Sequence, residues 1–279
     1  EYRNIIKSHI EPRFGEVRPA AITVQDSERF QRSMAGTPYQ SNRTLFLLGA
    51  LLKLAERKRL IPPGSNPVPG IERYKEKART RFLSAAELKA FGKALRELEA
   101  GTRISVHAAA AIRLLLLTGA RKSEILKLRW VDVDLTRARA YLPDPKNREP
   151  RFILLGEAAL TIMKGLPRTK DHAFVIEGQK LGEPMHDIKR PFGLVIGRAE
   201  IEDFRVHDLR HTAAASAASS GMSLLLVGQL LGHRSPASTK RYAHLTEGAV
   251  RVAAERVSGD LAAGLDGDRE AVIDLRRKG

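Results

Sequence analysis

The chain has 279 residues, enough for one large domain or two ordinary ones, and its 43% hydrophobic and 29% charged residues are typical of a globular protein with a buried core. It contains no cysteine, which excludes disulfides, thiolate metal sites and cysteine nucleophiles, and no apolar run is long enough to span a membrane. The 48 Lys and Arg residues against 32 Asp and Glu give a net charge of +16, which predicts an acidic partner such as a nucleic acid.

The first predicted region is a small helical domain over residues 1–61. Its clearest helix carries apolar residues at helical spacing between residues 45 and 55 and ends in a basic run. Proline and glycine then crowd residues 62–70, which neither a helix nor a central strand accepts, so residues 62–80 are predicted to form a linker. Basic residues of this region are candidate contacts to a DNA backbone: Arg43, Arg57, Lys58 and Arg59.

The second predicted region is a larger domain over residues 81–262. It begins with a capping box, Ser84 followed three residues later by Glu87, ahead of an amphipathic helix. Two β-prone runs, Leu135–Leu142 and Arg151–Leu155, are separated by a turn-rich stretch and predict a hairpin. Ala173 to Ile176 is predicted to add a third strand, and the chain after it is helical almost to its end. Two later helix starts are predicted, at Ser223 and at Ser235, which precedes Pro236.

The last predicted helix is amphipathic. Its apolar stripe runs from Val250 to Leu265 with a spacing of three or four residues. Residues 251–279 hold six basic and six acidic residues, so the whole positive excess lies in the first 250 residues. The apolar stripe of this segment, whose net charge is zero, is therefore expected to dock on another surface. Residues 263–279 are predicted to be a C-terminal tail with a frayed end.

Several anion-binding or nucleophilic side chains stand at predicted helix junctions. Arg121 follows a glycine that ends an apolar helix, which aims its guanidinium outward. His207 and Arg210 are three residues apart on one helix face, where a proton acceptor beside a bidentate cation suits a phosphate. His233 also follows a glycine at a helix end, and Tyr242 comes nine residues later. These side chains are expected to converge on one centre.

A metal site is the competing interpretation of the histidines. His211 lies four residues after His207, a spacing that two metal ligands on a helix use. No glutamate follows the first histidine as it does in zinc proteases, and no third ligand is evident. The sequence therefore predicts no metal, and His211 is interpreted as a packing or supporting residue.

In these segments the sequence resembles the tyrosine recombinase, or phage integrase, family. The family's first box matches residues 118–124 and runs on to Trp130, and its second box matches residues 207–212, 231–233 and 241–244. The resemblance implies a mainly α fold with a small antiparallel β-sheet (α+β). It also implies a helical, SAM-like core-binding domain followed by a catalytic domain with the DNA-breaking-rejoining enzyme fold.

The resemblance assigns three residues to the phosphate. Arg121 and Arg210 would cradle its non-bridging oxygens, and His233 would add a hydrogen bond in the transition state. Because two guanidinium groups can neutralise a phosphodiester, the implied reaction needs neither a metal nor another cofactor.

The resemblance assigns three further residues to bond breaking and proton transfer. Tyr242 is the implied nucleophile and would form a covalent 3′-phosphotyrosine. A phenol with a pKa near 10 attacks poorly at neutral pH, and the family resemblance gives the role of its proton acceptor to His207. Lys146, in the turn between the two β-prone runs, matches the general acid that protonates the departing 5′-hydroxyl.

The implied function is site-specific DNA recombination that integrates or excises a phage or mobile element. The implied partners are double-stranded DNA, further copies of the chain in a tetrameric synapse, and accessory DNA-bending or directionality proteins. The implied location is the bacterial cytoplasm, at the nucleoid.

Three alternatives remain open at this point. They are a recombinase that resolves chromosome dimers, a type IB topoisomerase that relaxes DNA as a monomer, and a catalytically silent DNA-binding protein. The silent protein predicts loss of an active-site side chain, and none of the six is missing. The C-terminal stripe docks either on a neighbouring protomer or on its own catalytic domain.

Overall fold

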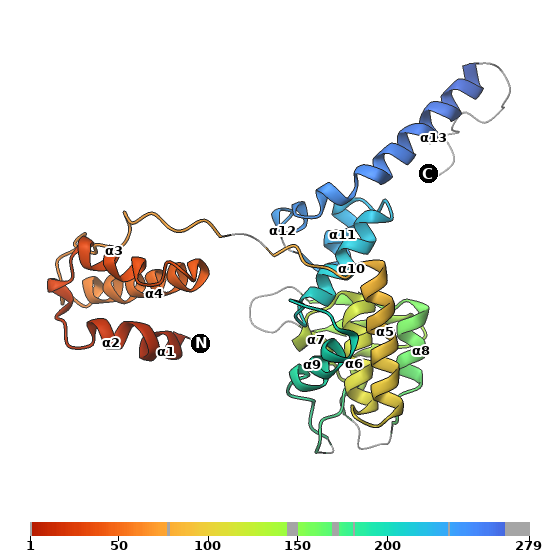
Figure 1. Ribbon diagram of the computed structural model, residues 1–279, viewed down its shortest axis with the longest axis horizontal. Coiled ribbons are helices and arrows are strands. Elements are labelled where there is room, and N and C mark those ends of the chain that lie inside the picture. The colour runs from red at the N-terminus through yellow and green to blue at the C-terminus, as the bar shows by residue number, and fades with distance from the viewer. Residues whose placement is uncertain are drawn as a thin grey trace. The chain divides into compact units, whose positions relative to one another are not determined.

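The computed structural model describes residues 2–76, 79–143, 150–168, 173–180, 182–233 and 235–265. The chain divides into two compact units, Glu1–Arg79 and Thr80–Gly279, which run from red to orange and from yellow to blue in Figure 1. Most described residues are helical and three short strands form one antiparallel sheet, so the predicted fold class is confirmed. No helix within the described ranges has the length and apolar character needed to cross a membrane.

The first unit is a helical bundle with its own core. Leu45, Leu48 and Leu52 lie on the buried face of its longest helix, and the rings of Phe14 and Phe30 meet edge-to-face with centroids 5.1 Å apart. The predicted helix is confirmed, including its end in the basic run. The elements of this unit are α1 (Tyr2–Ile5), a π-helical turn (Ile6–Ile10), α2 (Glu11–Phe14), a 3₁₀ turn (Pro19–Ala21), α3 (Val24–Arg32) and α4 (Pro38–Arg57).

The proline-rich segment after α4 packs onto this unit. Val68 and Ile71 are buried in the same core, although no helix or strand forms around them. The Asn42 side chain on α4 also donates to the Tyr74 carbonyl at 2.8 Å and accepts from the Tyr74 amide at 2.9 Å. The prolines therefore end the helix, but the chain after them still packs on the first unit. The predicted linker of residues 62–80 thus begins inside that compact unit.

The candidate DNA contacts of this unit have different surroundings. Arg43 is half-buried on α4, where its guanidinium lies over the rings of Tyr2 and Tyr39 at 5.9 and 6.0 Å. The basic run at residues 57–59 is exposed at the end of α4. A DNA contact by any of these residues stays a prediction.

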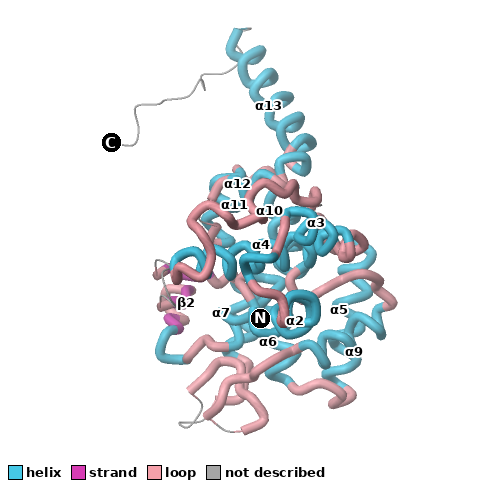
Figure 2. The backbone as a smooth tube through the Cα atoms, turned by 90° about the vertical axis from the view of Figure 1, so that its left-hand side faces the viewer, coloured by secondary structure: helices cyan, strands magenta, loops and turns pink. Residues whose placement is uncertain are grey.

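The second unit is built around one largely buried helix, α6 (Val106–Thr118). Ala109, Ile112 and Leu114 lie on different sides of α6 and are all 0% exposed, as expected for a helix that is apolar all round. Around α6 pack α5 (Ala85–Ala100), α8 (Glu157–Lys164), α9 (Lys189–Ala199) and α10 (Asp208–Ser219), of which α5 and α9 lie side by side in Figure 2. The capping box at the start of α5 is confirmed, because the Glu87 amide donates to Ser84 Oγ at 3.2 Å.

The small sheet contains the predicted hairpin but not the predicted third strand. β2 (Arg139–Leu142) and β3 (Arg151–Leu154) pair antiparallel, and β1 (Val133–Asp134) completes the sheet in the order β1-β2-β3, magenta in Figure 2. The expected strand at 173–176 is wrong, because Phe174 forms only an isolated bridge with Arg129. That segment pairs with residues 128–130, ahead of the sheet, rather than with a sheet edge.

The end of the chain is helical, as predicted. The start of α11 (Leu224–Leu231) is confirmed, since Ser223 Oγ accepts from the Leu226 amide at 3.3 Å. The expected Ser235 cap is wrong, because α12 (Ala237–Lys240) has Pro236 at its N-cap position and no side-chain cap. Beyond a 3₁₀ turn (Ala243–Leu245) comes α13 (Glu247–Leu265), whose Val257 and Leu261 are 56% and 54% exposed.

Candidate active site

Arg121 is placed by a sharp turn between two helices. α6 ends at Gly119, which adopts a left-handed φ of +62°, and α7 (Lys122–Leu126) begins three residues later. The Arg121 amide donates to Glu124 Oε2 at 2.7 Å, which caps α7 and fixes the direction in which the chain leaves the turn. The turn between the helices therefore carries the first candidate guanidinium.

Gly119 is required at this turn for two independent reasons. A left-handed φ strains any residue with a Cβ by about 1–2 kcal/mol, and a Cβ on Gly119 would lie 2.6 Å from Cδ2 of the fully buried Leu231. We expect Gly119→Ala to lower the free energy of unfolding by about 2 kcal/mol or more. Urea unfolding followed by circular dichroism measures this loss.

The matched control is Gly193→Ala on the exposed face of α9, where a Cβ meets nothing within 4 Å. There alanine is expected to stabilise the protein by about 0.5–1 kcal/mol, since glycine is a poor helix former. A Gly119→Ala protein as stable as the wild type would contradict the argument.

Arg210 lies in the first turn of α10 and is 5% exposed. Its Nη1 donates to the Gly119 carbonyl at 2.7 Å, so the second candidate guanidinium is fastened to the turn that presents the first. Burial, followed by the positive charge of Arg121, lowers the pKa of Arg210 to about 10. Arg210 is still cationic at neutral pH, and its remaining N–H donors are available to an anion.

The half-buried carboxylate of Glu124 links two arginines. Glu124 Oε1 accepts from Arg121 Nη1 at 2.8 Å, and its Oε2 accepts from Nη2 of Arg151, the first residue of β3, also at 2.8 Å. Arg121 Nη2 reaches the Gly232 carbonyl at 3.3 Å, and a Cβ on Gly232 would lie 2.5 Å from Arg151 Nε. Burial raises the pKa of Glu124, but hydrogen bonding to Arg121 and the charge of Arg151 outweigh it, and the net shift is downward.

His233 follows Gly232, which ends α11 with a left-handed φ of +68°. Its Nδ1 is 2.8 Å from Oγ1 of the buried Thr239 on α12, which leaves Nε2 as the ring nitrogen for a ligand. Burial, and then the charges of Arg210 and Arg121, lower the pKa of His233 to about 4. His233 is therefore neutral at pH 7 and can donate from Nε2 when its proton is there.

Tyr242 is held from two sides and is only 4% exposed. Its ring packs in a small apolar cluster with Val227 and Leu231 of α11. Its hydroxyl is 2.5 Å from Nδ1 of His211, one turn along α10 from His207. The phenol therefore meets His211, whereas the resemblance gave the role of its proton acceptor to His207. Burial is the main reason that the pKa of Tyr242 is raised.

His207 faces a cavity instead of the tyrosine. With Arg210 it lines a hollow of about 470 Å³ that also has Lys122, Lys189 and Arg205 in its wall. Burial, then the charge of Arg210, lowers the pKa of His207. Its ring meets that of His211 edge-on, with centroids 5.1 Å apart and planes at 87°. His207 therefore lies between the basic cavity and the residue that contacts the phenol.

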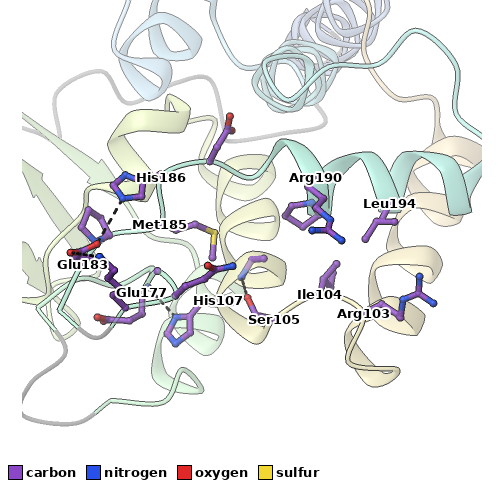
Figure 3. A pocket seen from close by; sticks show the side chains of 17 residues that line it. Arg103, Ile104, Ser105, His107, Glu177, Glu183, Met185, His186, Arg190 and Leu194 are labelled. Carbon is purple, nitrogen blue, oxygen red and sulfur yellow. Dashed lines mark hydrogen bonds and ion pairs between the residues drawn. The ribbon is translucent and has the colours of Figure 1, made fainter.

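A larger cavity of about 760 Å³ lies elsewhere on the unit (Figure 3). Its wall includes His107 at the start of α6, Arg190 on α9, and the facing pair Glu183 and His186, with Glu183 Oε2 and His186 Nε2 3.9 Å apart. None of the predicted site residues lines this larger cavity. The candidate active site is therefore the region around Arg121, Arg210 and Tyr242.

Five of the six predicted site residues come together, and they come from four places in the chain: Arg121, His207, Arg210, His233 and Tyr242. The sixth, Lys146, lies outside the described residues. Sequence reasoning missed Glu124 and Arg151. The i,i+3 spacing from Arg121 could have indicated Glu124 as a cap, whereas nothing local indicates Arg151. Over the described part of the chain, no group of three or more His, Asp or Glu side chains could hold a metal ion.

Comparison with known proteins agrees with this geometry. Residues 81–248, more than half of the chain, match the model of the phage integrase family. A shufflon-specific DNA recombinase of Escherichia coli is 30% identical over 183 residues, which are 65% of this chain and 44% of that protein. A tyrosine recombinase XerC of Staphylococcus epidermidis is 28% identical over 63% of this chain and 61% of its own length. The chain thus spans less than half of the first of these relatives.

Solved structures share the fold. A lambda integrase dimer bound to a COC′ core site aligns with a TM-score of 0.70 at 19% identity, over 86% of this chain and 69% of that one. A Tn1549 transposon integrase in complex with transposon right end DNA aligns with a TM-score of 0.68 at 21% identity, over 92% of both chains. From the match that covers residues 81–248, together with the two boxes of residues that the fold brings together, the chain belongs to the phage integrase family.

Proposed function

We propose that the protein is a site-specific DNA recombinase that cleaves and rejoins strands through a covalent link to Tyr242. The observation that carries the proposal is the convergence of Arg121, Arg210 and His233 beside a buried phenol. A phosphodiester resists attack until its charge is neutralised, and pre-positioned cations and hydrogen-bond donors act most strongly in a water-poor site.

The same geometry supports a division of roles. Arg121 and Arg210 hold the non-bridging oxygens of the phosphodiester, and His233 donates to a phosphoryl oxygen. Tyr242 attacks the phosphorus. The 5′-oxygen leaves with a proton, and the family resemblance, rather than the geometry, proposes Lys146 as its donor. The retained bond energy of the phosphotyrosine lets a 5′-hydroxyl reverse the step, on the same strand or on another.

Names of the similar proteins support a DNA substrate and an assembly of several copies. They include integrases bound to DNA as a dimer and as a tetramer on a Holliday junction. We propose that this chain also acts on duplex DNA as an oligomer, and that the basic surface of the first unit contributes to DNA binding. Because a shufflon recombinase, a phage integrase and XerC proteins are all among the relatives, the proposal is the strand-exchange reaction that these names share.

The test is covalent capture. The protein is incubated with a pool of nicked DNA duplexes that have a randomised centre, denatured in detergent and digested with trypsin. We expect a DNA-linked peptide running from Tyr242 to Arg251, since trypsin cuts after Arg241 and Arg251. Mass spectrometry identifies the modified residue. Capture through another residue, or no capture at all, would contradict the proposal.

A further inference from the structure

We propose that His211, rather than His207, accepts the proton of Tyr242 when the tyrosine attacks. The inference rests on the proposed function and names the base within it. Its main observation is the 2.5 Å separation of the Tyr242 hydroxyl from Nδ1 of His211. Both residues are buried, at 4% and 6% exposure, so bulk water is not at hand to take the proton.

His207, at the N-cap of α10, and His211, within α10, face different neighbours. The ring centroid of His211 is 6.0 Å from that of Tyr242, whereas His207 touches the edge of the His211 ring and lines the cavity beside Arg210. A general base must be within hydrogen-bond reach of the proton that it removes. Across the described residues, His211 is the side chain that meets this condition for Tyr242.

The charges around His211 keep it in the form that accepts a proton. Burial, then the charges of His207 and Arg241, lower its pKa to about 4, so the ring is neutral at pH 7. With its proton on Nε2, Nδ1 carries the lone pair that faces the phenol. The charged and titratable groups around it are His207, Asp208, Arg210, His233, Arg241 and Tyr242.

Binding of DNA strengthens this base when it is needed. The phosphodiester adds a negative charge next to Arg210, which offsets the repulsion that disfavours the imidazolium. Tyr242 cannot ionise unaided, because burial raises the pKa of its hydroxyl despite the nearby charges of Arg241 and Arg210. An acceptor beside the phenol is therefore required at neutral pH.

The step balances without any further reactant. The phenol proton moves to His211 Nδ1 as the phenol oxygen bonds to phosphorus, and the bond from phosphorus to the 5′-oxygen breaks. The 5′-oxygen takes its proton from a separate acid, for which Lys146 is proposed above. In rejoining, the 5′-hydroxyl returns its proton to that acid as its oxygen attacks the phosphotyrosine, and the departing Tyr242 oxygen regains its proton from His211.

The test compares His211→Asn with His207→Asn on a nicked duplex selected by covalent capture with the wild-type chain. Asparagine can accept a hydrogen bond close to the position of Nδ1 but does not take up a proton. We expect His211→Asn to form the adduct about 10²-fold more slowly at pH 7. Its rate should rise by about tenfold per pH unit above neutrality, because hydroxide must then remove the proton. The wild-type rate should stay nearly flat, and His207→Asn should lack the slope. The control His186→Gln, at an exposed position in the other cavity, should cleave like the wild type.

A 5′-sulfur leaving group separates the base from the acid, since a thiolate departs without a proton. We expect His211→Asn to stay slow on that duplex. The inference would be overturned if the 5′-sulfur restored the cleavage rate of His211→Asn. It would also be overturned if His211→Asn cleaved at a rate within about threefold of the wild type, or faster. Failure of the wild-type chain to capture DNA would overturn the proposed function, and the inference with it. Normal capture by the wild type and by His211→Asn alike would overturn the inference alone.

A second measurement does not depend on the folding of His211→Asn. Nitrogen NMR of ¹⁵N-histidine-labelled protein is compared between the wild type and Tyr242→Phe at pH 7. We expect one neutral histidine, protonated on Nε2, to change its Nδ1 signal when the phenol hydroxyl is removed. No such change, or a proton already on the affected Nδ1, would overturn the inference.

Discussion

Tyr242→Phe is expected to abolish the covalent DNA adduct while leaving the fold and DNA binding in place. The substitution removes one oxygen atom and keeps the ring, which packs with Val227 and Leu231 whether or not the hydroxyl is present. The hydrogen-bond partner of the lost oxygen is His211, which has no hydroxyl to take its place. The adduct is counted on a denaturing gel with the captured duplex, and binding is measured by mobility shift.

The matched control for this change is Tyr141→Phe. Tyr141 lies on β2, is 38% exposed, and packs against Phe152 with ring centroids 5.5 Å apart and planes tilted by 52°. That variant should form as much adduct as the wild type. Tyr242→Phe itself is expected to lose about 1–3 kcal/mol of stability at most, from the unpaired Nδ1 of His211. Adduct formation by Tyr242→Phe would show that another residue is the nucleophile.

Arg210→Lys is expected to slow adduct formation by about 10²–10³-fold, the usual cost of losing one transition-state donor. Arg210 makes two kinds of contact. Its Nη1 donates to the Gly119 carbonyl, and the other N–H groups of the guanidinium remain for an anion. One ammonium cannot make both contacts with the same geometry. Burial and the nearby Arg121, which already lower the pKa of Arg210 to about 10, would also bring a lysine closer to losing its charge at neutral pH.

Single-turnover rates and DNA affinity are measured together for this variant. Affinity should change far less than rate, since the many other basic residues still attract the backbone. The control is Arg198→Lys on α9, whose exposed guanidinium pairs with Glu97 at 2.8 Å. Equal rates for Arg210→Lys and Arg198→Lys would contradict a role for the Arg210 fork in the reaction.

Local patterns predicted the elements that place the site. The capping box at Ser84, the hairpin of β2 and β3, and the start of α11 are all encoded within a few neighbouring residues. The two boxes likewise predicted which side chains would meet, because each side chain stands at a helix end that its own neighbours define. Convergence of Arg121 and Arg210 then follows from one bond, that between Arg210 and the Gly119 carbonyl.

Features set by long-range packing could not be predicted in the same way. His207 and His211 lie one turn apart on α10, so spacing does not say which of them meets Tyr242; that depends on the path of the chain after α12. The pair of Arg151 and Glu124 joins residues 27 positions apart on a strand and a helix. The segment around Val68 is rich in proline, and only the core beneath it turns an apparent linker into part of the first unit.

Because Glu124 is shared by Arg121 and Arg151, it cancels one positive charge of the three guanidinium groups at the centre and leaves two. His211 and His233 add none at neutral pH, and Arg241 is exposed to screening solvent. A phosphodiester carries one negative charge, whereas the five-coordinate phosphorus formed by attack of a phenolate carries two. The two remaining guanidinium charges therefore attract the five-coordinate species more strongly than the singly charged diester, and the field of the centre favours the five-coordinate species.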